Sequence, residues 1–233
     1  MNIGLFGYGK MGKMIEQIAQ ERGHTIVAKV DVGSTEVDYK SMDVAIDFST
    51  PDAAFNNITS CFENGVPVIS GTTGWLSNYE KAIEICNQTK SAFIYASNFS
   101  LGVNVFFELN SYLAKMMSTL NQYQVSMEEI HHTQKLDAPS GTAITLAEGI
   151  IENTGYIDWK LDEFGEKSIS ITSKREGTVP GTHTIVYESA VDDIEIKHTA
   201  HNREGFALGA VIAAEWILGK TGVFSMKDVL NLK

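Results

Sequence analysis

The sequence has 233 residues, of which 43% are hydrophobic and 20% charged, and its formal net charge is -11. These values are typical of a folded globular protein of one or two domains, and they exclude a disordered or fibrous chain. The acidic balance argues against nucleic acid and anionic membranes as partners, because binding phosphate groups requires a basic surface.

The chain begins with a strand-like segment, Asn2 to Phe6, which leaves no room for a signal peptide, and no apolar run approaches membrane-spanning length. The two cysteines, Cys61 and Cys86, are expected to be free thiols in a reducing compartment. We therefore expect a cytoplasmic protein.

Short apolar runs alternate with helix-like segments through the first hundred residues. The clearest helix has hydrophobic residues at helical spacing and ends at Gly23, as helices commonly end at glycine. Strands separated by helices predict a doubly wound α/β domain, in which helices cover both faces of a parallel sheet. The predicted strands are Ile3 to Phe6, Thr25 to Val30, Val44 to Phe48, Pro67 to Ser70 and Ala92 to Ala96.

The pattern changes after an apolar helix at about residues 102–117, because the strands that follow are rarely separated by helices. Two further helices are predicted, at 140–153 and 206–218, and the second returns to the first domain. We therefore predict an α+β domain on a mixed sheet, residues 102–203, inserted into an α/β domain of residues 1–101 and 204–233. Its strands are Tyr123 to Ile130, Ser168 to Ser173, His183 to Ser189 and Asp193 to Ala200.

A glycine-rich turn, Gly7-Tyr8-Gly9-Lys10-Met11-Gly12, directly follows the first strand and opens a helix. Glycines in this pattern allow the backbone to approach a pyrophosphate, and the helix N-terminus supplies amide donors. Asp31 stands at the end of the second strand, where a carboxylate binds the ribose of a dinucleotide. The combination predicts a Rossmann-type dinucleotide-binding domain.

The choice between NADH and NADPH stays open. Asp31 favours NADH, since a carboxylate repels a 2′-phosphate, whereas Lys10, Lys13 and Lys29 could each approach such a phosphate. A solvated surface position is the simpler interpretation of any one of these lysines. We expect NADH, NADPH or both as cofactor.

Two loops follow later strands of the same sheet. Ligands gather at the carboxyl ends of parallel strands, so both loops are candidates for contact with the nicotinamide. Each is equally well interpreted as a simple turn, with Asn98 as the cap of the next helix. The candidate residues are Gly71, Thr72 and Thr73 in one loop and Ala96, Ser97, Asn98 and Phe99 in the other.

The segment from Glu129 to Thr142 carries the most chemical information. A strand leads His131 and His132 into a loop with Lys135, and Pro139 then precedes a helix start at Ser140-Gly141-Thr142. Lysine, histidine and helix N-terminal amides together can bind a dicarboxylate, and histidine or lysine can supply the proton that a hydride reduction needs. Taken alone, the two histidines are more simply interpreted as pairing with backbone groups.

Zinc binding is a competing interpretation, because His131, His132, His183, His198 and His201 could converge in the second domain. The spacing does not support it, since there is no H-E-x-x-H motif and no paired cysteine motif, and adjacent strand residues cannot easily share one metal. We expect no metal.

The order and intervals of these motifs resemble those of the dihydrodipicolinate reductase family, and the resemblance extends over nearly the whole chain. It implies NAD(P)H-dependent reduction of 4-hydroxy-tetrahydrodipicolinate, on the route to diaminopimelate and lysine, by a homotetramer that forms through the sheet of its central domain. It further implies His131 as acid or base, Lys135 as proton donor, and His132, Gly141 and Thr142 as substrate ligands. The matching motifs are Gly7 to Gly12, Ile46 to Ser49, Gly71 to Gly74, Asn98 to Ser100, His131 to Thr142, Arg175 to His183 and Gly222 to Leu230.

The chain departs from the family pattern in a short connection between residues 153 and 168 and in the absence of an arginine after Asp31. Two alternatives remain: another two-domain NAD(P)-dependent dehydrogenase of a small carboxylate, and a dinucleotide-binding redox sensor without enzymatic activity. The cations and helix start between His131 and Thr142 favour the reductase, because a sensor needs no proton donor beside an anion site.

Overall fold

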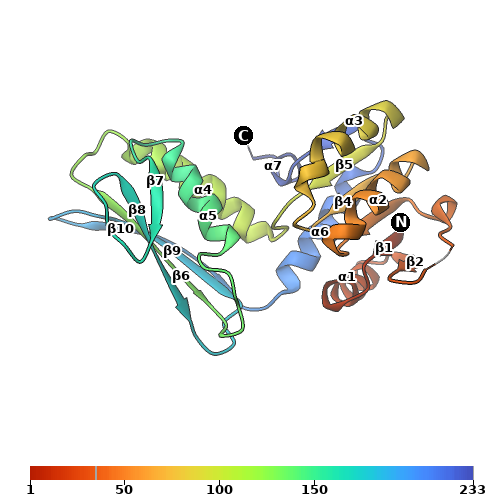
Figure 1. Cartoon of the computed structure of the whole chain (residues 1–233), viewed down its shortest axis with the longest axis horizontal. Helices are drawn as coiled ribbons and strands as arrows, with labels where there is room; N and C mark the ends of the chain where they lie inside the picture. Colours follow the sequence, from red (N-terminus) through yellow and green to blue (C-terminus); the bar gives the residue numbers. More distant parts are fainter. Residues whose placement is uncertain (35, 233) are drawn as a thin grey trace. The chain divides into compact units, whose positions relative to one another are not determined.

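The computed structural model describes residues 1–34 and 36–232. The chain divides into two compact units, unit 1 with residues 1–101 and 204–233 and unit 2 with residues 102–203 (Figure 1). No helix among the described residues combines the length and the apolar character needed to span a membrane.

Unit 1 is built on sheet A, whose strands run parallel in the order β11-β5-β4-β3-β1-β2. The inner strand β3 is buried at all four positions, as expected where helices cover both faces of a parallel sheet. The strands are β1 Asn2–Phe6, β2 Thr25–Val30, β3 Val44–Asp47, β4 Val68–Ser70, β5 Ala92–Tyr95 and β11 Gly222–Phe224.

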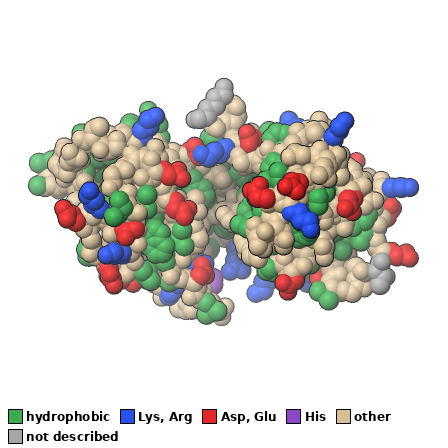
Figure 2. All heavy atoms as spheres, turned by 45° about the horizontal axis from the view of Figure 1, so that its top comes forward, with side chains coloured by type: hydrophobic (Ala, Val, Ile, Leu, Met, Phe, Trp, Pro, Cys, Tyr) green, Lys and Arg blue, Asp and Glu red, His purple; other side chains and the backbone are tan. Residues whose placement is uncertain are grey.

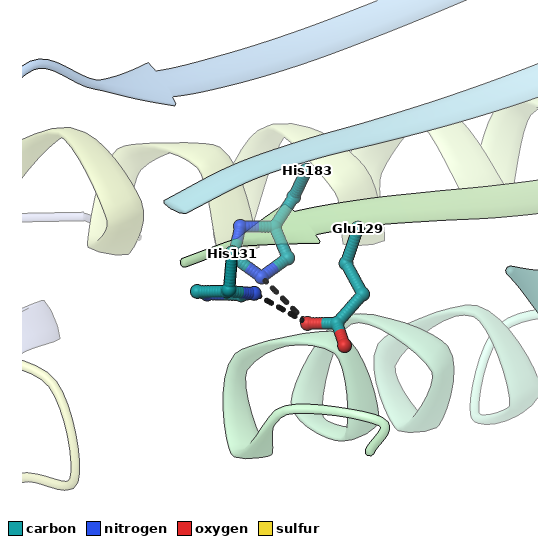
Figure 3. A group of neighbouring side chains, drawn as sticks. All are labelled: Glu129, His131 and His183. Carbon is teal, nitrogen blue, oxygen red and sulfur yellow. Dashed lines mark ion pairs between the residues drawn. The ribbon is translucent and has the colours of Figure 1, made fainter. Parts of the chain in front are cut away.

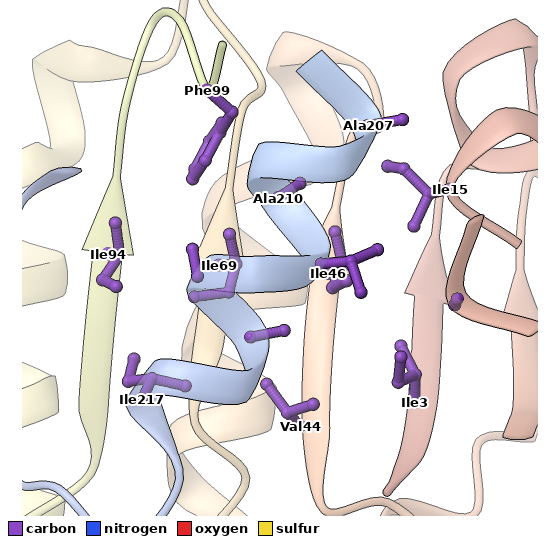
Figure 4. Packing of buried hydrophobic residues seen from close by; sticks show 14 of the residues in the cluster. Ile3, Ile15, Val44, Ile46, Ile69, Ile94, Phe99, Ala207, Ala210 and Ile217 are labelled. Atoms are coloured by element: carbon purple, nitrogen blue, oxygen red, sulfur yellow. The ribbon is translucent and has the colours of Figure 1, made fainter. Parts of the chain in front are cut away.

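Two hydrophobic clusters hold the helices of unit 1 against sheet A. Helices α1 (Lys10–Glu21) and α6 (Glu204–Ile217) bury Ile15 and Ile217 against one face (Figure 4). Helices α2 (Pro51–Glu63) and α3 (Tyr79–Thr89) contribute to the cluster on the other face. The short helices are the 3-10 turns Tyr39–Ser41 and Leu76–Asn78 and the C-terminal α7, Met226–Val229.

Helix α6 lies directly on the segment that follows β5. A Cβ atom at Gly209 would lie 1.8 Å from the carbonyl oxygen of Phe99, so only glycine permits this approach. At the start of the helix, a Cβ at Gly205 would lie 3.6 Å from Ser100 Oγ. The chain therefore leaves unit 1 and returns to it at neighbouring points.

The order of strands reverses at β1, which pairs with β2 on one side and β3 on the other. Gly7 follows β1 with φ of +88°, and a Cβ there would lie 2.2 Å from the carbonyl oxygen of Phe48. A Cβ at Gly12 would lie 2.3 Å from the carbonyl oxygen of Gly7. Both glycines are thus required by the turn at the place where doubly wound sheets bind ligands.

Unit 2 is built on sheet B, with strand order β10-β9-β6-β8-β7. The pairs β10-β9 and β9-β6 are antiparallel, and β6-β8 and β8-β7 are parallel, so the sheet is mixed as predicted. Helices α4 (Leu101–Met117) and α5 (Gly141–Ile151) supply its core with buried residues. The strands are β6 Gln124–His131, β7 Asp158–Leu161, β8 Ser168–Arg175, β9 Gly181–Glu188 and β10 Asp193–Ala200.

Strand β6 alternates strictly between buried and partly exposed positions. Val125 and Met127 belong to the core of unit 2, and Glu129 and His131 continue the same buried face. The hydrophobic pattern that fixes the strand therefore also turns two ionisable side chains inward.

Candidate active site

The centre of the candidate site in unit 2 is the fully buried carboxylate of Glu129. The register of sheet B places His183 of β9 opposite Glu129 on one side and Ser173 of β8 opposite it on the other. Arg175 lies two residues further along β8, level with His131. Three strands thus bring polar groups to one carboxylate.

The two oxygens of Glu129 have different partners. Oε1 accepts hydrogen bonds from Ser173 Oγ at 2.8 Å, Arg175 Nη2 at 3.1 Å and the Ser140 amide at 3.2 Å. Burial acts to raise the pKa of Glu129, but the close contact with His131, the hydrogen bonds from Ser140 and Ser173 and the charge of His131 hold it well below its usual range. Glu129 is therefore a carboxylate at neutral pH.

The second oxygen, Oε2, faces two histidines (Figure 3). It lies 2.9 Å from His131 Nδ1 and 3.8 Å from His183 Nε2. The close contact with His131 is an ion-pair distance without hydrogen-bond geometry, and neither atom has another hydrogen-bond partner. An imidazole with a proton on Nδ1 is favoured by the carboxylate beside it.

His183 is held in the neutral form. Burial, together with the nearby charge of His131, lowers the pKa of His183 to about 3. Its Nε2 atom lies 3.1 Å from Ser140 Oγ, and its ring centre lies 5.1 Å from that of His131. Because His183 is neutral, the ionic partners of the Glu129 carboxylate are Arg175 and His131.

The same three side chains form a geometrically possible metal site, since ligand atoms of Glu129, His131 and His183 all lie within 4.8 Å of one another. The guanidinium of Arg175, bonded to the other oxygen of Glu129, already supplies the positive charge that an ion would bring. The group includes two of the five histidines of the zinc interpretation and omits His132, His198 and His201. The expectation of no metal stays a prediction.

The loop after β6 is fixed by Arg175, which donates to the Asp137 carbonyl at 2.6 Å and to the Lys135 carbonyl at 3.4 Å. Lys135 Nζ contacts both carboxylate oxygens of Asp137, at 2.8 and 2.7 Å. His132 Nε2 lies 3.3 Å from Arg203 Nη2. The loop thus holds the Lys135 backbone against Arg175 and places His132 beside Arg203.

Helix α5 begins at Gly141, as predicted. Ser140 is its N-cap: the hydroxyl accepts a hydrogen bond from the Ala143 amide at 3.2 Å, while the Ser140 amide donates to Glu129. The first residues of the helix, Gly141 and Thr142, therefore follow directly on Ser140, which contacts both Glu129 and His183.

The structure thus brings four of the predicted residues into one region of unit 2: His131, Lys135, Gly141 and Thr142. The fifth, His132, contacts Arg203 instead. Several residues that complete this region had no predicted role in catalysis or in substrate binding. A signal existed for the first of them, because a residue two positions before His131 on a strand shares its face. These residues are Glu129, Ser173, Arg175 and His183.

Unit 1 contains a cavity of about 340 Å³ at the carboxyl ends of β1, β2 and β3. The predicted residues Gly7, Tyr8, Gly9 and Asp31 line it. Lys10, Met11 and Gly12 form the first turn of α1 directly after it. The remaining lining residues are Val30, Val32, Phe48, Ser49, Thr50, Ala53 and Asn57.

A second buried carboxylate, Asp47, is the last residue of β3 and bonds to the cavity-lining residues Ser49 and Asn57. It accepts hydrogen bonds from the hydroxyls of Ser49 at 2.6 Å, Thr72 at 2.7 Å and Ser70 at 3.0 Å. Burial raises the pKa of Asp47, although these hydroxyls and Asn57 act to lower it. Asp47 therefore ties the loop after β3 to the loop after β4.

The two predicted nicotinamide loops have defined local structure. The ring of Phe48 lies against Gly71, where a Cβ would approach it to 2.3 Å, and against Phe99 with ring centres 5.9 Å apart. The Asn98 side chain accepts from the Ser100 amide at 2.9 Å, which is a local turn. Thr73 and Ser97 are exposed, and Ala96 is half-buried. None of the predicted nicotinamide contacts, 71–73 and 96–99, lines the cavity of unit 1, and their contact with nicotinamide stays a prediction.

Comparison with known families decides between the functional alternatives. Residues 1–99 match the family model for the N-terminus of dihydrodipicolinate reductase, and residues 102–230 match the model for its C-terminus. The chain belongs to the dihydrodipicolinate reductase family. The resemblance noted in the sequence and the α/β fold class are both confirmed.

Other members of the dihydrodipicolinate reductase family are similar over their full length. A 4-hydroxy-tetrahydrodipicolinate reductase of Christiangramia forsetii is 61% identical, with 99% of this chain and 98% of that protein aligned. The enzyme of Thermosipho africanus is 36% identical over the same shares. Among solved structures, dipicolinate-bound dihydrodipicolinate reductase from Paenisporosarcina sp. TG-14 superposes with a TM-score of 0.81 at 22% identity, covering 100% of this chain and 99% of that one.

Proposed function

We propose that unit 1 binds the reduced dinucleotide and that unit 2 binds the substrate and provides the proton. The reaction is that of the family: NAD(P)H-dependent reduction of 4-hydroxy-tetrahydrodipicolinate to tetrahydrodipicolinate, in diaminopimelate and lysine biosynthesis. Of the alternatives drawn from the sequence, the non-enzymatic sensor and the other dehydrogenases are set aside by this family membership. The assignment of each residue below is a proposal.

The turn after β1 suits a pyrophosphate. Cβ atoms at Gly7 and Gly12 would collide with backbone, so the turn is packed as tightly as glycine allows and leads directly into the N-terminus of α1. Asp31 lines the cavity beside it, in position for a ribose hydroxyl. The dinucleotide supplies a hydride when bound, and we assign its binding to Gly7, Tyr8, Gly9, Lys10, Met11, Gly12 and Asp31, with Gly71, Thr72, Thr73, Ala96, Ser97, Asn98 and Phe99 toward the nicotinamide.

The substrate carries two carboxylates, and unit 2 offers cations and helix amides for them. Lys135, His132 and the α5 start at Gly141 and Thr142 are the proposed ligands. The structure from Paenisporosarcina contains dipicolinate, which is also a dicarboxylate. Figure 2 shows acidic and basic side chains interspersed over the displayed faces, so the local grouping of cations matters more than a large one-sign surface.

His131 is the proposed acid or base. The Glu129 carboxylate favours a proton on Nδ1, which leaves Nε2 to exchange a proton with substrate. A Cβ at Gly181 would lie 3.0 Å from Nε2, so glycine provides room beside this nitrogen. Glu129 would then act through His131, by fixing its tautomer and the orientation of its ring.

Lys135 is the proposed proton donor and a carboxylate ligand. Its ammonium is paired with the Asp137 carboxylate, whose side chain is 60% exposed. Ion pairs with exposed carboxylates contribute little to stability, so substrate can replace Asp137 at small cost. The pair therefore keeps the Lys135 ammonium in place until a dicarboxylate binds.

The buried Glu129-His131 contact is the single observation that supports these roles best. The test is to mix purified protein with the condensation product of pyruvate and aspartate semialdehyde and to follow oxidation of NADH and, separately, of NADPH. Turnover with at least one cofactor is expected. No turnover with either would reject the activity.

His131→Gln and Lys135→Ala test the residue roles. Each is expected to lower kcat by about 100-fold or more, because a positioned acid or base contributes about that factor. Cofactor affinity should change by less than about two-fold, since both residues act on substrate and transition state. His201→Gln, at an exposed histidine of unit 2, is the matched control. An equal loss of NADH affinity would contradict the assigned roles.

We also propose a homotetramer that forms through sheet B. The face of this sheet opposite the core of unit 2 borders a hollow of about 760 Å³, lined by residues that include Ser126, Ser170, Thr184 and Glu195. Self-association of matching faces is the common way to cover such a surface. Light scattering after gel filtration should give four times the chain mass, and a monomer would reject this assembly.

A cytoplasmic location and the absence of nucleic acid or membrane partners stay predictions.

A further inference from the structure

A cation beside the ribose end of the cavity is already paired. Lys29, on β2, lies two residues before Asp31, and its Nζ atom lies 2.7 Å from Glu16 Oε1. It also donates to the hydroxyl of Tyr8 at 3.0 Å and lies 4.4 Å from the centre of the Tyr8 ring. Tyr8 in turn donates to Glu16 Oε2 and lines the cavity.

Both members of this pair are charged at neutral pH. Hydrogen bonds from Lys29 and Tyr8 lower the pKa of Glu16, and the hydrogen bond to Glu16 raises the pKa of Lys29. Glu16 comes from α1 and its side chain is only 17% exposed, so the carboxylate is fixed on the helix beside the lysine. The positive charge of Lys29 is therefore neutralised next to Tyr8.

The cavity itself adds no positive charge. Among the described residues that line it, Asp31 is the one charged side chain, and Val32 follows where an arginine would face a 2′-phosphate. A 2′-phosphate at this end would meet a carboxylate, whereas a free 2′-hydroxyl can donate to it. The local charges favour NADH.

We propose that Glu16 determines cofactor specificity: by neutralising Lys29 it keeps the ribose end of the cavity acidic and discriminates against NADPH. This inference rests on the proposed dinucleotide site in unit 1. Glu16 belongs to unit 1 and the proposed proton transfer belongs to unit 2, so the effect of Glu16 should appear in the ratio of cofactor affinities and leave the proton transfer unchanged.

The experiment compares Kd for NADH and NADPH by fluorescence titration of the full chain. The unmodified protein should bind NADH at least about five-fold more tightly than NADPH, a ratio that one local charge can produce. In Glu16→Gln, which keeps the shape and can still hydrogen-bond Tyr8, Kd for NADPH should fall by about five-fold and Kd for NADH should change by less than about two-fold. Added salt should reduce the gain, because exposed charges are screened.

Two further variants make the result specific. Glu21→Gln removes an acidic residue from the same helix, where the side chain bonds Gln17, and should leave the ratio unchanged. The double variant Glu16→Gln with Lys29→Met should lose the gain in NADPH affinity, because the lysine that Glu16 neutralises is then absent. Lys13 is a second cation near Tyr8, with its ammonium 6.0 Å from the ring centre. If the gain persisted in the double variant, it would come from Lys13 and not from Lys29.

The outcomes distinguish this inference from the function on which it rests. If neither cofactor binds, the dinucleotide site in unit 1 is wrong. If both bind but the unmodified protein prefers NADPH, or Glu16→Gln changes both affinities alike, or Glu21→Gln has the same effect, then Glu16 does not set the specificity.

Discussion

The two units each bury one carboxylate, and the two carboxylates differ in their partners. Asp47 in unit 1 is surrounded by neutral hydroxyl donors, and burial raises its pKa. Glu129 in unit 2 is equally buried but contacts Arg175 and His131, and its pKa is lowered. Burial alone therefore does not set the direction of a pKa shift, because the charge of the partners decides it.

The difference separates two uses of a buried acid. Hydroxyl groups are neutral and can rotate to donate or to accept a hydrogen bond. Asp47 can therefore join the two loops whether its side chain is ionised or protonated. Arg175 and His131 lose their counter-charge if Glu129 is neutral, so this carboxylate organises the electrostatics of its site. We therefore expect substitution of Glu129 to be far more destabilising than substitution of Asp47.

The strongest test of this comparison is Glu129→Gln. The amide cannot balance the positive charge of Arg175, whose guanidinium is half-buried against the fully buried Glu129, and removing one partner of a buried ion pair costs about 3 kcal/mol or more. Urea unfolding followed by circular dichroism should show this loss, and kcat should fall because His131 loses its carboxylate partner.

Glu128→Gln is the matched control for that variant. Glu128 is the neighbouring residue of β6, and it forms an ion pair with Lys174 in which both side chains are at least 36% exposed. Its loss should cost less than about 1 kcal/mol. Similar losses for both glutamates would remove the distinction between the buried and the exposed pair.

The two carboxylates should change the pH dependence of stability in opposite directions. Glu129 has a folded-state pKa below its ordinary value of 4.5, so its contribution is present above that pH and is lost as the pH falls. Asp47 has a folded-state pKa above its ordinary value of 3.8, so its contribution is present below that pH and is lost as the pH rises. Relative to the unmodified protein, acid destabilisation below about pH 5 should be shallower in Glu129→Gln, by about 1 to 2 kcal/mol, and steeper in Asp47→Asn. Parallel curves would contradict the opposite shifts.

Asp47→Asn should be the milder substitution at neutral pH. The hydroxyls of Ser70 and Thr72 can rotate to donate or accept, so the expected loss is less than about 2 kcal/mol, the range of a few rearranged hydrogen bonds. The same urea unfolding measures it. A loss equal to that of Glu129→Gln would mean that hydroxyl and ionic partners are equivalent here.

Ser140→Ala gives the smallest expected effect. It removes the N-cap of α5 and the contact with His183 but leaves the backbone amide that donates to Glu129. The expected loss is about 1 kcal/mol, as for other N-cap serines. Ser140→Thr, which keeps a hydroxyl, should recover most of the stability in the same thermal or urea unfolding measurement.

Much of the fold could be predicted from the sequence because its signals are local. The predicted strands of both units match observed strands to within three residues at each end, and the helix start at Gly141 follows from Ser140 and Pro139. Strands β7 and β11 were not predicted: they have four and three residues, and their pairing with β8 and β5 is their main support.

The candidate site was predicted less completely, because its ionic partners are distant in sequence. Arg175 contacts Glu129 across 46 residues, and no local pattern indicates which strands will be neighbours. By contrast, Gly7, Tyr8, Gly9 and Asp31 line one cavity because the spacing of a βαβ unit fixes their relation.

The neighbouring positions of Ser100 and Gly205 have a consequence for how the chain could be shortened or rebuilt. Every strand of sheet A comes from residues 1–101 or 204–233, so a chain that joined these two pieces by a short linker would keep the whole ladder of that sheet. Residues 102–203 could therefore be inserted, deleted or exchanged as one domain without changing the strand pairing of sheet A.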